Sequence, residues 1–233
     1  MVAATARFIP QFMTIKNYID YGFIGDVFLA RGQYIHDISP YFKSTPWRLT
    51  DPQDLMLGGG IHPFDLLRWY MGDVDEVFSY SIKGGITKEY PLDDNFIVSL
   101  KFKSKAIAQV SVFTGIIDPP EPSILPVIDI NLFGKYGTVV GNFSEGEKGF
   151  LKVVSKKFDV IPTQEINFAA DKEGEIHKVG SHEKSLILYF EKCIKEDINP
   201  VLSVIEGAKD VAVGVAAWES IRKNKPIKVK NDF

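Results

Sequence analysis

The segment FIVSLKF, Phe96–Phe102, decides the fold class, because every second side chain from Phe96 onward is apolar. This period of two is typical of a β-strand with one face buried. Similar β-branched and aromatic runs follow one another from Val77 to about Val160. With Phe96–Phe102 and an earlier run at Val27–Ile35 they predict about seven strands: Phe78–Ile82, Ile107–Phe113, Ile128–Phe133, Thr138–Val140 and Phe150–Val160. Short polar links between them, such as the turn at Gly134 and Gly137, favour antiparallel neighbours.

Helical patterns lie on the N-terminal side of this run of strands. Pro10–Tyr21 has a proline in its first turn, where a missing N–H is tolerated, and Gly22 follows as a stop. A second helix is expected from about Pro63 to Met71. Between them, after the strand Val27–Ile35, a loop rich in proline and polar residues covers His36–Gly60.

Two more helices are predicted after the strands. Apolar residues repeat at helical spacing at Leu186, Ile187, Phe190, Cys193 and Ile194, and this stripe places the single cysteine in the core. Ser203-Val-Ile-Glu206 has the form of a capping box that opens a final helix ending before Pro226. Helices at both ends and strands in the middle predict an α+β fold, a predominantly antiparallel open sheet with helices on one face. With no linker-like boundary, residues 1–233 are expected to form a single domain.

Composition excludes several classes of function. The chain has 27 basic and 30 acidic residues, a net charge of -3, and 45% hydrophobic residues, so it favours neither nucleic acid nor an anionic membrane. No apolar run approaches the ~20 residues that span a bilayer, and we expect a cytoplasmic protein. The sequence lacks Gly-x-Gly-x-x-Gly, Gly-x-Ser-x-Gly, His-Glu-x-x-His and paired cysteines, so no nucleotide loop, serine nucleophile or metal site is predicted.

The candidate chemistry centres on Gly58-Gly59-Gly60-Ile61-His62-Pro63. His62 lies at the start of the predicted helix, where the helix dipole disfavours imidazolium and leaves a neutral ring that can accept a proton. The three glycines expose backbone and would let a flat substrate approach closely. The alternative is structural: His62 caps the helix, the glycines form a tight turn, and Asp65 counters the dipole.

Other candidate residues are less distinctive. Trp47-Arg48 precedes the glycines and could hold a hydroxylated or carboxylated ligand, although an arginine stacked on a tryptophan can equally fix a loop. His36-Asp37 at the end of a strand could face either a site or solvent. On helical spacing Trp69 is read as a core residue, while His177 and His182 lie in polar segments.

Five segments together resemble, in order and spacing, the C-terminal domain of the glucose-fructose oxidoreductase / inositol dehydrogenase / MocA family. They are Arg7-Phe-Ile-Pro10, Ile19-Asp-Tyr-Gly-Phe-Ile-Gly25, Trp47-Arg48, Gly60-Ile-His-Pro-Phe-Asp-Leu-Leu-Arg-Trp69, and Ala208–Pro226 with Trp218-Glu-Ser-Ile-Arg222. Intact members of this family are NAD(P)-dependent oxidoreductases of sugars, cyclic polyols or related carbonyl compounds. The resemblance implies that His62 is the catalytic histidine, which moves a proton while hydride passes to or from the nicotinamide.

The same resemblance implies a substrate-binding and oligomerisation domain, with a homo-oligomer formed through the open sheet face. Tyr34, Trp47, Arg48 and the glycines Gly58, Gly59 and Gly60 are expected to contact a small-molecule substrate. NAD or NADP is expected for an intact member, whereas this chain, without the Rossmann half and its Glu-Lys-Pro lysine, should bind no dinucleotide and be inactive alone. The Rossmann domain would then be separate or missing.

One departure from the family pattern concerns the proton site itself. The family has an aspartate four residues before the histidine, where this chain has Gly58. Asp54 could substitute for that carboxylate only if the loop folds back. The alternative function is therefore a non-catalytic binding or assembly module that retains the fold without dehydrogenase activity.

Overall fold

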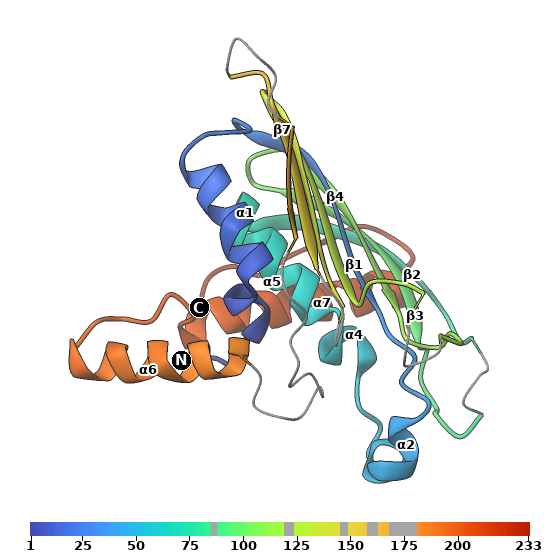
Figure 1. Cartoon of the computed structure of the whole chain (residues 1–233). Coiled ribbons are helices and arrows are strands. Elements are labelled where there is room, and N and C mark those ends of the chain that lie inside the picture. Colours follow the sequence, from blue (N-terminus) through green and yellow to red (C-terminus); the bar gives the residue numbers. More distant parts are fainter. Residues whose placement is uncertain (85–87, 119–123, 145–148, 158–162, 168–180) are drawn as a thin grey trace.

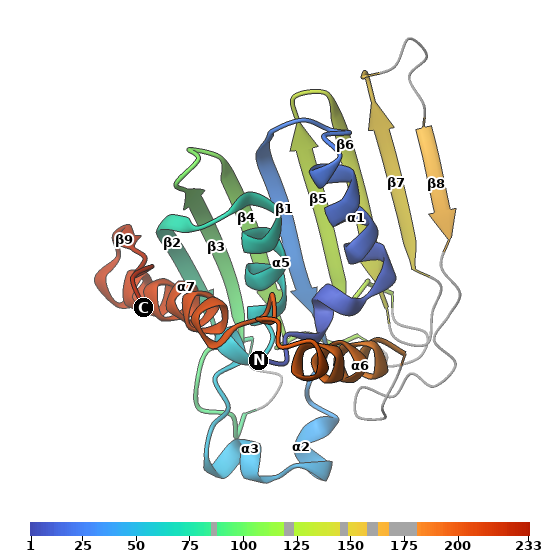
Figure 2. The ribbon, with the colours of Figure 1, turned by 90° about the vertical axis from the view of Figure 1, so that its left-hand side faces the viewer.

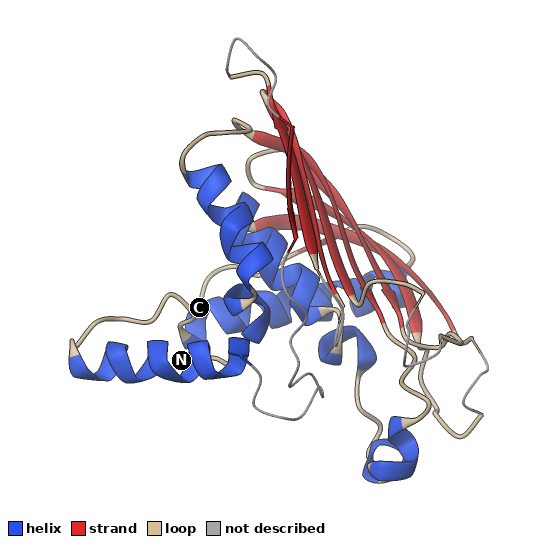
Figure 3. Cartoon of the chain, in the orientation of Figure 1, coloured by secondary structure: helices blue, strands red, loops and turns tan. Residues whose placement is uncertain are grey.

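The computed structural model describes residues 1–84, 88–118, 124–144, 149–157, 163–167 and 181–233. One large sheet forms a wall, and the helices gather on one side of it (Figure 1, Figure 3). The predicted α+β class, an open and mostly antiparallel sheet with helices on one face, is confirmed.

The sheet has nine strands in the order β8-β7-β6-β5-β1-β4-β3-β2-β9. The strands are β1 Val27–Ile35, β2 Val74–Ile82, β3 Asn95–Phe102, β4 Ile107–Phe113, β5 Ile128–Gly134, β6 Gly137–Phe143, β7 Phe150–Ser155, β8 Thr163–Asn167 and β9 Ile227–Lys228. The predicted strands are all present; β8 and β9 are additional, and β7 ends at Ser155, while residues 158–160 of the predicted strand lie outside the described residues.

One strand pair departs from the antiparallel expectation. β1 inserts between β4 and β5 and runs parallel to β4, with Ile35 opposite Phe113. This is possible because helices, and not a tight turn, follow β1 along the chain; parallel neighbours need such a long connection. The parallel pair brings the carboxyl ends of β1 and β4 to the same edge of the sheet.

The helices begin and end close to where the sequence patterns place them. They are the 3-10 turn η1 Thr5–Phe8 and the helices α1 Pro10–Asp20, α2 Tyr41–Ser44, α3 Trp47–Thr50, α4 Leu55–Gly58, α5 Ile61–Met71, α6 Ser181–Lys195 and α7 Val204–Lys223. The Ser203 side chain accepts a hydrogen bond from the Glu206 N–H at 3.2 Å, so it caps α7 as predicted. The segment predicted as a loop, His36–Gly60, contains α2, α3 and α4.

The core lies between the sheet and three helices. Figure 2 looks onto this side, where α7, α5 and α1 lie across neighbouring parts of the sheet. Alternate strand residues such as Val98 and Val110 are fully buried against helix residues such as Phe12, Phe64 and Leu67. Burial of such apolar surface, at roughly 25 cal/mol per Å², is the main force that holds the helices on the sheet.

Helix α6 only partly meets the expectation of a core helix. Leu186 and Cys193 are buried, as predicted, but Ile187, Phe190 and Ile194 are exposed. The helix packs along η1 and lies beside the lower end of the sheet and not across its face (Figure 2), so one side of its apolar stripe is uncovered. Among the described residues no helix has the length and apolar character needed to cross a bilayer.

Candidate active site

The three glycines form the tight connection between α4 and α5. Gly58 ends α4, and Gly60 is the residue before Ile61, the first of α5. A Cβ on Gly60 would lie 2.4 Å from the Met56 carbonyl oxygen, so this glycine faces the protein interior. A Cβ on Gly59 would lie 2.5 Å from the Tyr34 ring. Gly59 is therefore required for the close approach of Tyr34 to the start of α5.

A cavity of about 230 Å³ lies beside this connection. Its walls come from the end of β1, the α2–α4 segment, the start of α5 and the residue after β4. The lining residues are Tyr34, His36, Ile38, Tyr41, Arg48, Gln53, Leu55, Gly58, Gly59, His62 and Thr114. His62, in the first turn of α5, lines this concave space together with other polar side chains.

Tyr34 contacts two imidazoles, that of His62 with its ring and that of His36 with its hydroxyl. The Tyr34 ring stacks on His62 with 5.6 Å between centroids and 24° between planes. Its hydroxyl lies 3.3 Å from His36 Nδ1, and His36 meets Tyr41 edge-on at 5.3 Å. Stacking of this kind restricts the orientation of His62 without using its nitrogen atoms as hydrogen-bonding groups.

Arg48 contributes a guanidinium to the lining of the cavity. Its Nη1 donates a hydrogen bond to Gln53 Oε1, and its Cζ lies 5.1 Å from the centre of the Trp47 ring. Gln53 is itself fixed, because its backbone carbonyl accepts a hydrogen bond from the Tyr90 hydroxyl at 2.5 Å. Burial raises the pKa of Tyr90 strongly, so this hydroxyl keeps its proton at neutral pH.

Gln53 occupies the space where a side chain at position 58 would begin. A Cβ on Gly58 would lie 2.7 Å from Gln53 Nε2. Asp54 does not supply a carboxylate to the cavity: one oxygen accepts from the Leu57 N–H at 3.1 Å, and the other from Trp218 Nε1 at 2.8 Å. Asp54 therefore caps α4 and ties it to α7, and the Gln53 amide lies against Gly58.

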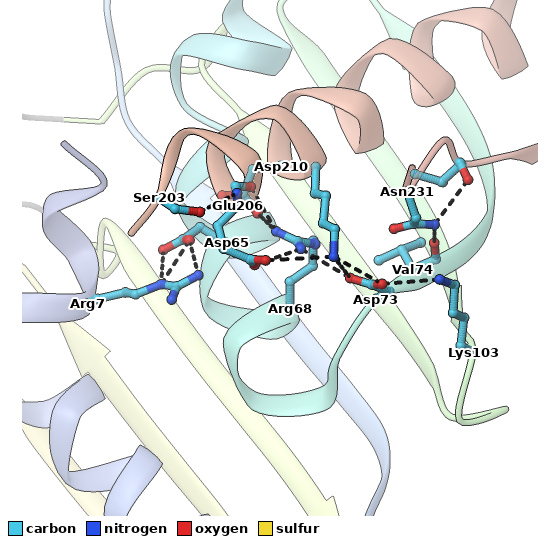
Figure 4. Close-up of polar contacts among 12 residues, drawn as sticks. Arg7, Asp65, Arg68, Asp73, Val74, Lys103, Ser203, Glu206, Asp210 and Asn231 are labelled. Carbon is cyan, nitrogen blue, oxygen red and sulfur yellow. Dashed lines mark hydrogen bonds and ion pairs between the residues drawn. The ribbon is translucent and has the colours of Figure 1, made fainter. Parts of the chain in front are cut away.

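Buried contacts between arginines and acidic side chains fix α5, in whose first turn His62 lies; Figure 4 shows these contacts. Arg7 Nε donates to both Asp65 oxygens at 2.9 and 3.0 Å, and Arg7 Nη2 lies 2.6 Å from Asp65 Oδ1. One turn later Arg68 pairs with Asp210 and with Glu206, the latter at 3.0 Å, both on α7. Arg7, 58 residues away in sequence, is thus the partner of Asp65, which the sequence could only assign to the helix dipole.

The structure brings together most of the predicted site residues. Tyr34, Arg48, Gly58, Gly59 and His62 line the cavity. Trp47 and Gly60 do not: the Trp47 side chain is 53% exposed and Gly60 is buried. Tyr41, Gln53 and Thr114 were not predicted from the sequence, and His36 was predicted to face either a site or solvent. The position of His36 at the end of a strand, before a polar loop, was the available signal.

Of the remaining histidines, His177 lies outside the described residues. His182 lies near the start of α6, which does not line the cavity. Within the described part of the chain no group of three or more histidine, cysteine or acidic residues could hold a metal ion.

Fold and site together define a one-sided open-sheet domain whose small-molecule cavity lies at the start of a helix. The model of the GFO/IDH/MocA C-terminal domain matches residues 12–140, and the chain belongs to this family. It is also 22% identical over 228 residues to scyllo-inositol 2-dehydrogenase (NAD(+)) of Bacillus subtilis (strain 168), covering 96% of this chain and 60% of that protein.

Solved structures with the same fold include an oxidoreductase from Agrobacterium radiobacter in complex with NAD+, L-tartaric acid and magnesium, with a TM-score of 0.80 and 19% identity. That likeness covers 98% of this chain and 64% of the other. Levoglucosan dehydrogenase in complex with NADH and levoglucosan has a TM-score of 0.80 at 21% identity, covering 100% of this chain and 66% of that one. The chain thus spans about 60 to 66% of the length of these relatives.

Proposed function

We propose that this chain is the substrate-binding and oligomerisation domain of an NAD(P)-dependent oxidoreductase. The substrate is a sugar, a cyclic polyol or a related hydroxyl or carbonyl compound. The observation that carries the proposal is the position of His62 in a cavity that Arg48 also lines, stacked on Tyr34, in a chain of the GFO/IDH/MocA C-terminal domain family. The dehydrogenases named above support the class of substrate.

The cavity fits a substrate and not a dinucleotide. Its volume of about 230 Å³ is smaller than the roughly 300–1,000 Å³ of pockets for drug-sized ligands. The chain also has no Gly-x-Gly-x-x-Gly loop to hold a pyrophosphate. NAD or NADP, which accepts hydride in such enzymes, would therefore be held by residues outside this chain, either in a separate Rossmann domain or in another part of the same protein.

The chemistry that this chain supplies is proton transfer. Oxidation of a secondary alcohol removes a hydride from carbon and a proton from oxygen. His62, as neutral imidazole, accepts the hydroxyl proton in that direction and returns it to the carbonyl oxygen in the other. Tyr34 keeps the His62 ring in one orientation by stacking on it, and Arg48 holds the substrate.

A second candidate is a non-catalytic binding or assembly module. The specific observation that favours it is the amide of Gln53 over Gly58, because among the described residues no carboxylate lines the cavity to orient His62 or to stabilise its charged form. A histidine so placed can still bind a ligand through hydrogen bonds.

The coding sequence next to this chain and an activity assay separate the two candidates. A segment encoding Gly-x-Gly-x-x-Gly and Glu-Lys-Pro, in frame or adjacent, supports the enzyme. Assayed with that segment, His62→Asn should lower kcat by about 10²–10⁴-fold, the usual contribution of general acid–base catalysis. An unchanged kcat in this variant contradicts the role of His62, and the absence of any such segment favours the module.

The position of the cofactor site has its own test. Titration of NADH and of NADPH fluorescence with this chain alone should show no binding at micromolar concentration. Micromolar binding would place dinucleotide contacts within this chain and contradict the proposed division of roles.

A further inference from the structure

Arg48 is the one residue in the described lining of the cavity whose polar side chain only donates hydrogen bonds. The two tyrosines, the two histidines, Gln53 and Thr114 can both donate and accept, and the described lining contains neither aspartate nor glutamate. A neutral polyol needs no charged partner, whereas a guanidinium without a carboxylate beside it favours an anionic group.

The amide oxygen beside Arg48 and the two acidic side chains nearest in sequence to the cavity accept hydrogen bonds from protein donors. Gln53 Oε1 accepts from Arg48 Nη1. Asp54, next in sequence, accepts from Leu57 and Trp218. Asp37, next to His36, accepts from the Ser39 N–H and hydroxyl at 2.9 and 2.6 Å. The two acidic side chains nearest in sequence to the cavity are thus turned toward protein donors.

Arg48 has donor capacity that its protein partners do not fill. Its Nε is buried and has no hydrogen-bond partner among the described residues, and the hydrogen bond that its Nη1 donates goes to a neutral amide. No carboxylate of the described residues lies within salt-bridge distance of its guanidinium. Arginine with free donors in a partly buried wall matches a carboxylate, which accepts two parallel hydrogen bonds.

We propose that the cavity selects a carboxylated polyol, an aldonate- or uronate-type sugar acid, over the corresponding neutral sugar. This inference rests on the proposed function and specifies its substrate class. Arg48 binds the carboxylate, and the hydroxyl to be oxidised lies at His62. Gln53 is a positioning residue: its amide holds Arg48 without neutralising it, whereas a carboxylate there would pair with Arg48 and compete with the substrate.

Matched ligand pairs test the inference by calorimetry on the full chain. D-glucuronate and D-glucose differ only at C6, and glycerate and glycerol are a smaller pair of the same kind. We expect the acid of at least one pair to bind ten or more times tighter than its neutral partner, and the difference to shrink at high salt. Arg48→Gln should remove this preference and lower the affinity of the acid by a larger factor than that of the neutral compound, because only the acid pairs with the charge.

Two variants serve as controls. Arg222→Gln removes an exposed arginine at the far end of α7 and should leave both affinities unchanged. Gln53→Glu should lower the affinity of the acid at least tenfold while retaining the melting temperature of the wild type, since the new carboxylate pairs with Arg48. Retention of the acid preference in both Arg48→Gln and Gln53→Glu would overturn the role of Arg48.

The outcomes separate the inference from the proposed function. Equal affinities for acid and neutral compound in both pairs overturn the inference alone, because a polyol site is then still present. Absence of binding by all four compounds counts against both.

Discussion

At the scale of single residues, the glycines before His62 have three different roles. A side chain at Gly60 would collide with the Met56 carbonyl oxygen. One at Gly59 would collide with the Tyr34 ring, and one at Gly58 with the Gln53 amide. The first role is structural and the other two shape the cavity. The tight turn of the structural interpretation is present, but His62 is not the cap of α5, because Gly60 occupies that position. The functional interpretation of the glycines stays a prediction.

The Arg7–Asp65 pair gives a prediction at this scale. Both side chains are at least 95% buried, and Asp65→Ala would leave the Arg7 charge without its partner in the interior. We expect the free energy of unfolding, measured by urea denaturation, to fall by about 3–5 kcal/mol.

Asp20→Ala is the matched control. Asp20 pairs with Lys16 one turn earlier on α1 and is 55% exposed, so its loss should cost about 0.5 kcal/mol or less. A similar decrease in the free energy of unfolding in the two variants would show that the buried Arg7–Asp65 pair contributes no more to stability than the exposed pair.

At the scale of elements, the α5–α7 contact couples stability to pH. Burial raises the pKa of Asp210 to about 8, helped by the nearby Asp65 and opposed by Arg68, against an ordinary value of 3.8. Between about pH 4 and pH 8 the folded state therefore binds one more proton than the unfolded state. The free energy of unfolding should fall as pH rises through this window.

Asp210→Asn tests this coupling, because asparagine does not titrate. Urea denaturation at pH 5, 6, 7 and 8 should give a flatter dependence of stability on pH for the variant than for the wild type. Parallel curves would exclude Asp210 as the group responsible.

Local signals explain which elements could be predicted from sequence. The proline at the start of α1, the Ser203 cap of α7 and the alternation of β3 each act within a few residues, and each predicted element forms. The parallel pairing of β1 with β4 depends on the whole sheet and has no such signal. It places Thr114 beside the end of β1, where the His36 N–H donates to the Phe113 carbonyl at 2.9 Å. The contribution of Thr114 to the cavity wall could therefore not be predicted from the sequence.

At the scale of the whole molecule, the sheet face opposite the helices exposes an apolar patch. Tyr80, Ile82, Ile97 and Ile107 are 45–67% exposed, and the register of β2, β3 and β4 places them on this one face. Contiguous exposed apolar surface is typical of an interface. This patch supports our proposal that a second copy of the chain covers the open face.

Ile97→Glu should weaken that association, because it places a charge in the patch directly opposite Tyr80. Sedimentation velocity at micromolar concentration should show a dimer or larger species for the wild type and a shift toward monomer for the variant. Ile187→Glu, on the exposed side of α6, is the matched control and should sediment as the wild type does. A monomeric wild type would contradict the proposed assembly.

The most direct test of the central claim, that the cavity at the start of α5 is the substrate site, is NMR observation of the histidine ring protons. The His36 and His62 signals, assigned with asparagine variants, are followed during titration with myo-inositol, D-glucose and D-glucuronate. We predict that at least one compound shifts both signals saturably and leaves the His182 signal unchanged. Saturable binding that leaves the His62 signal in place, or no binding of any compound, would contradict the claim.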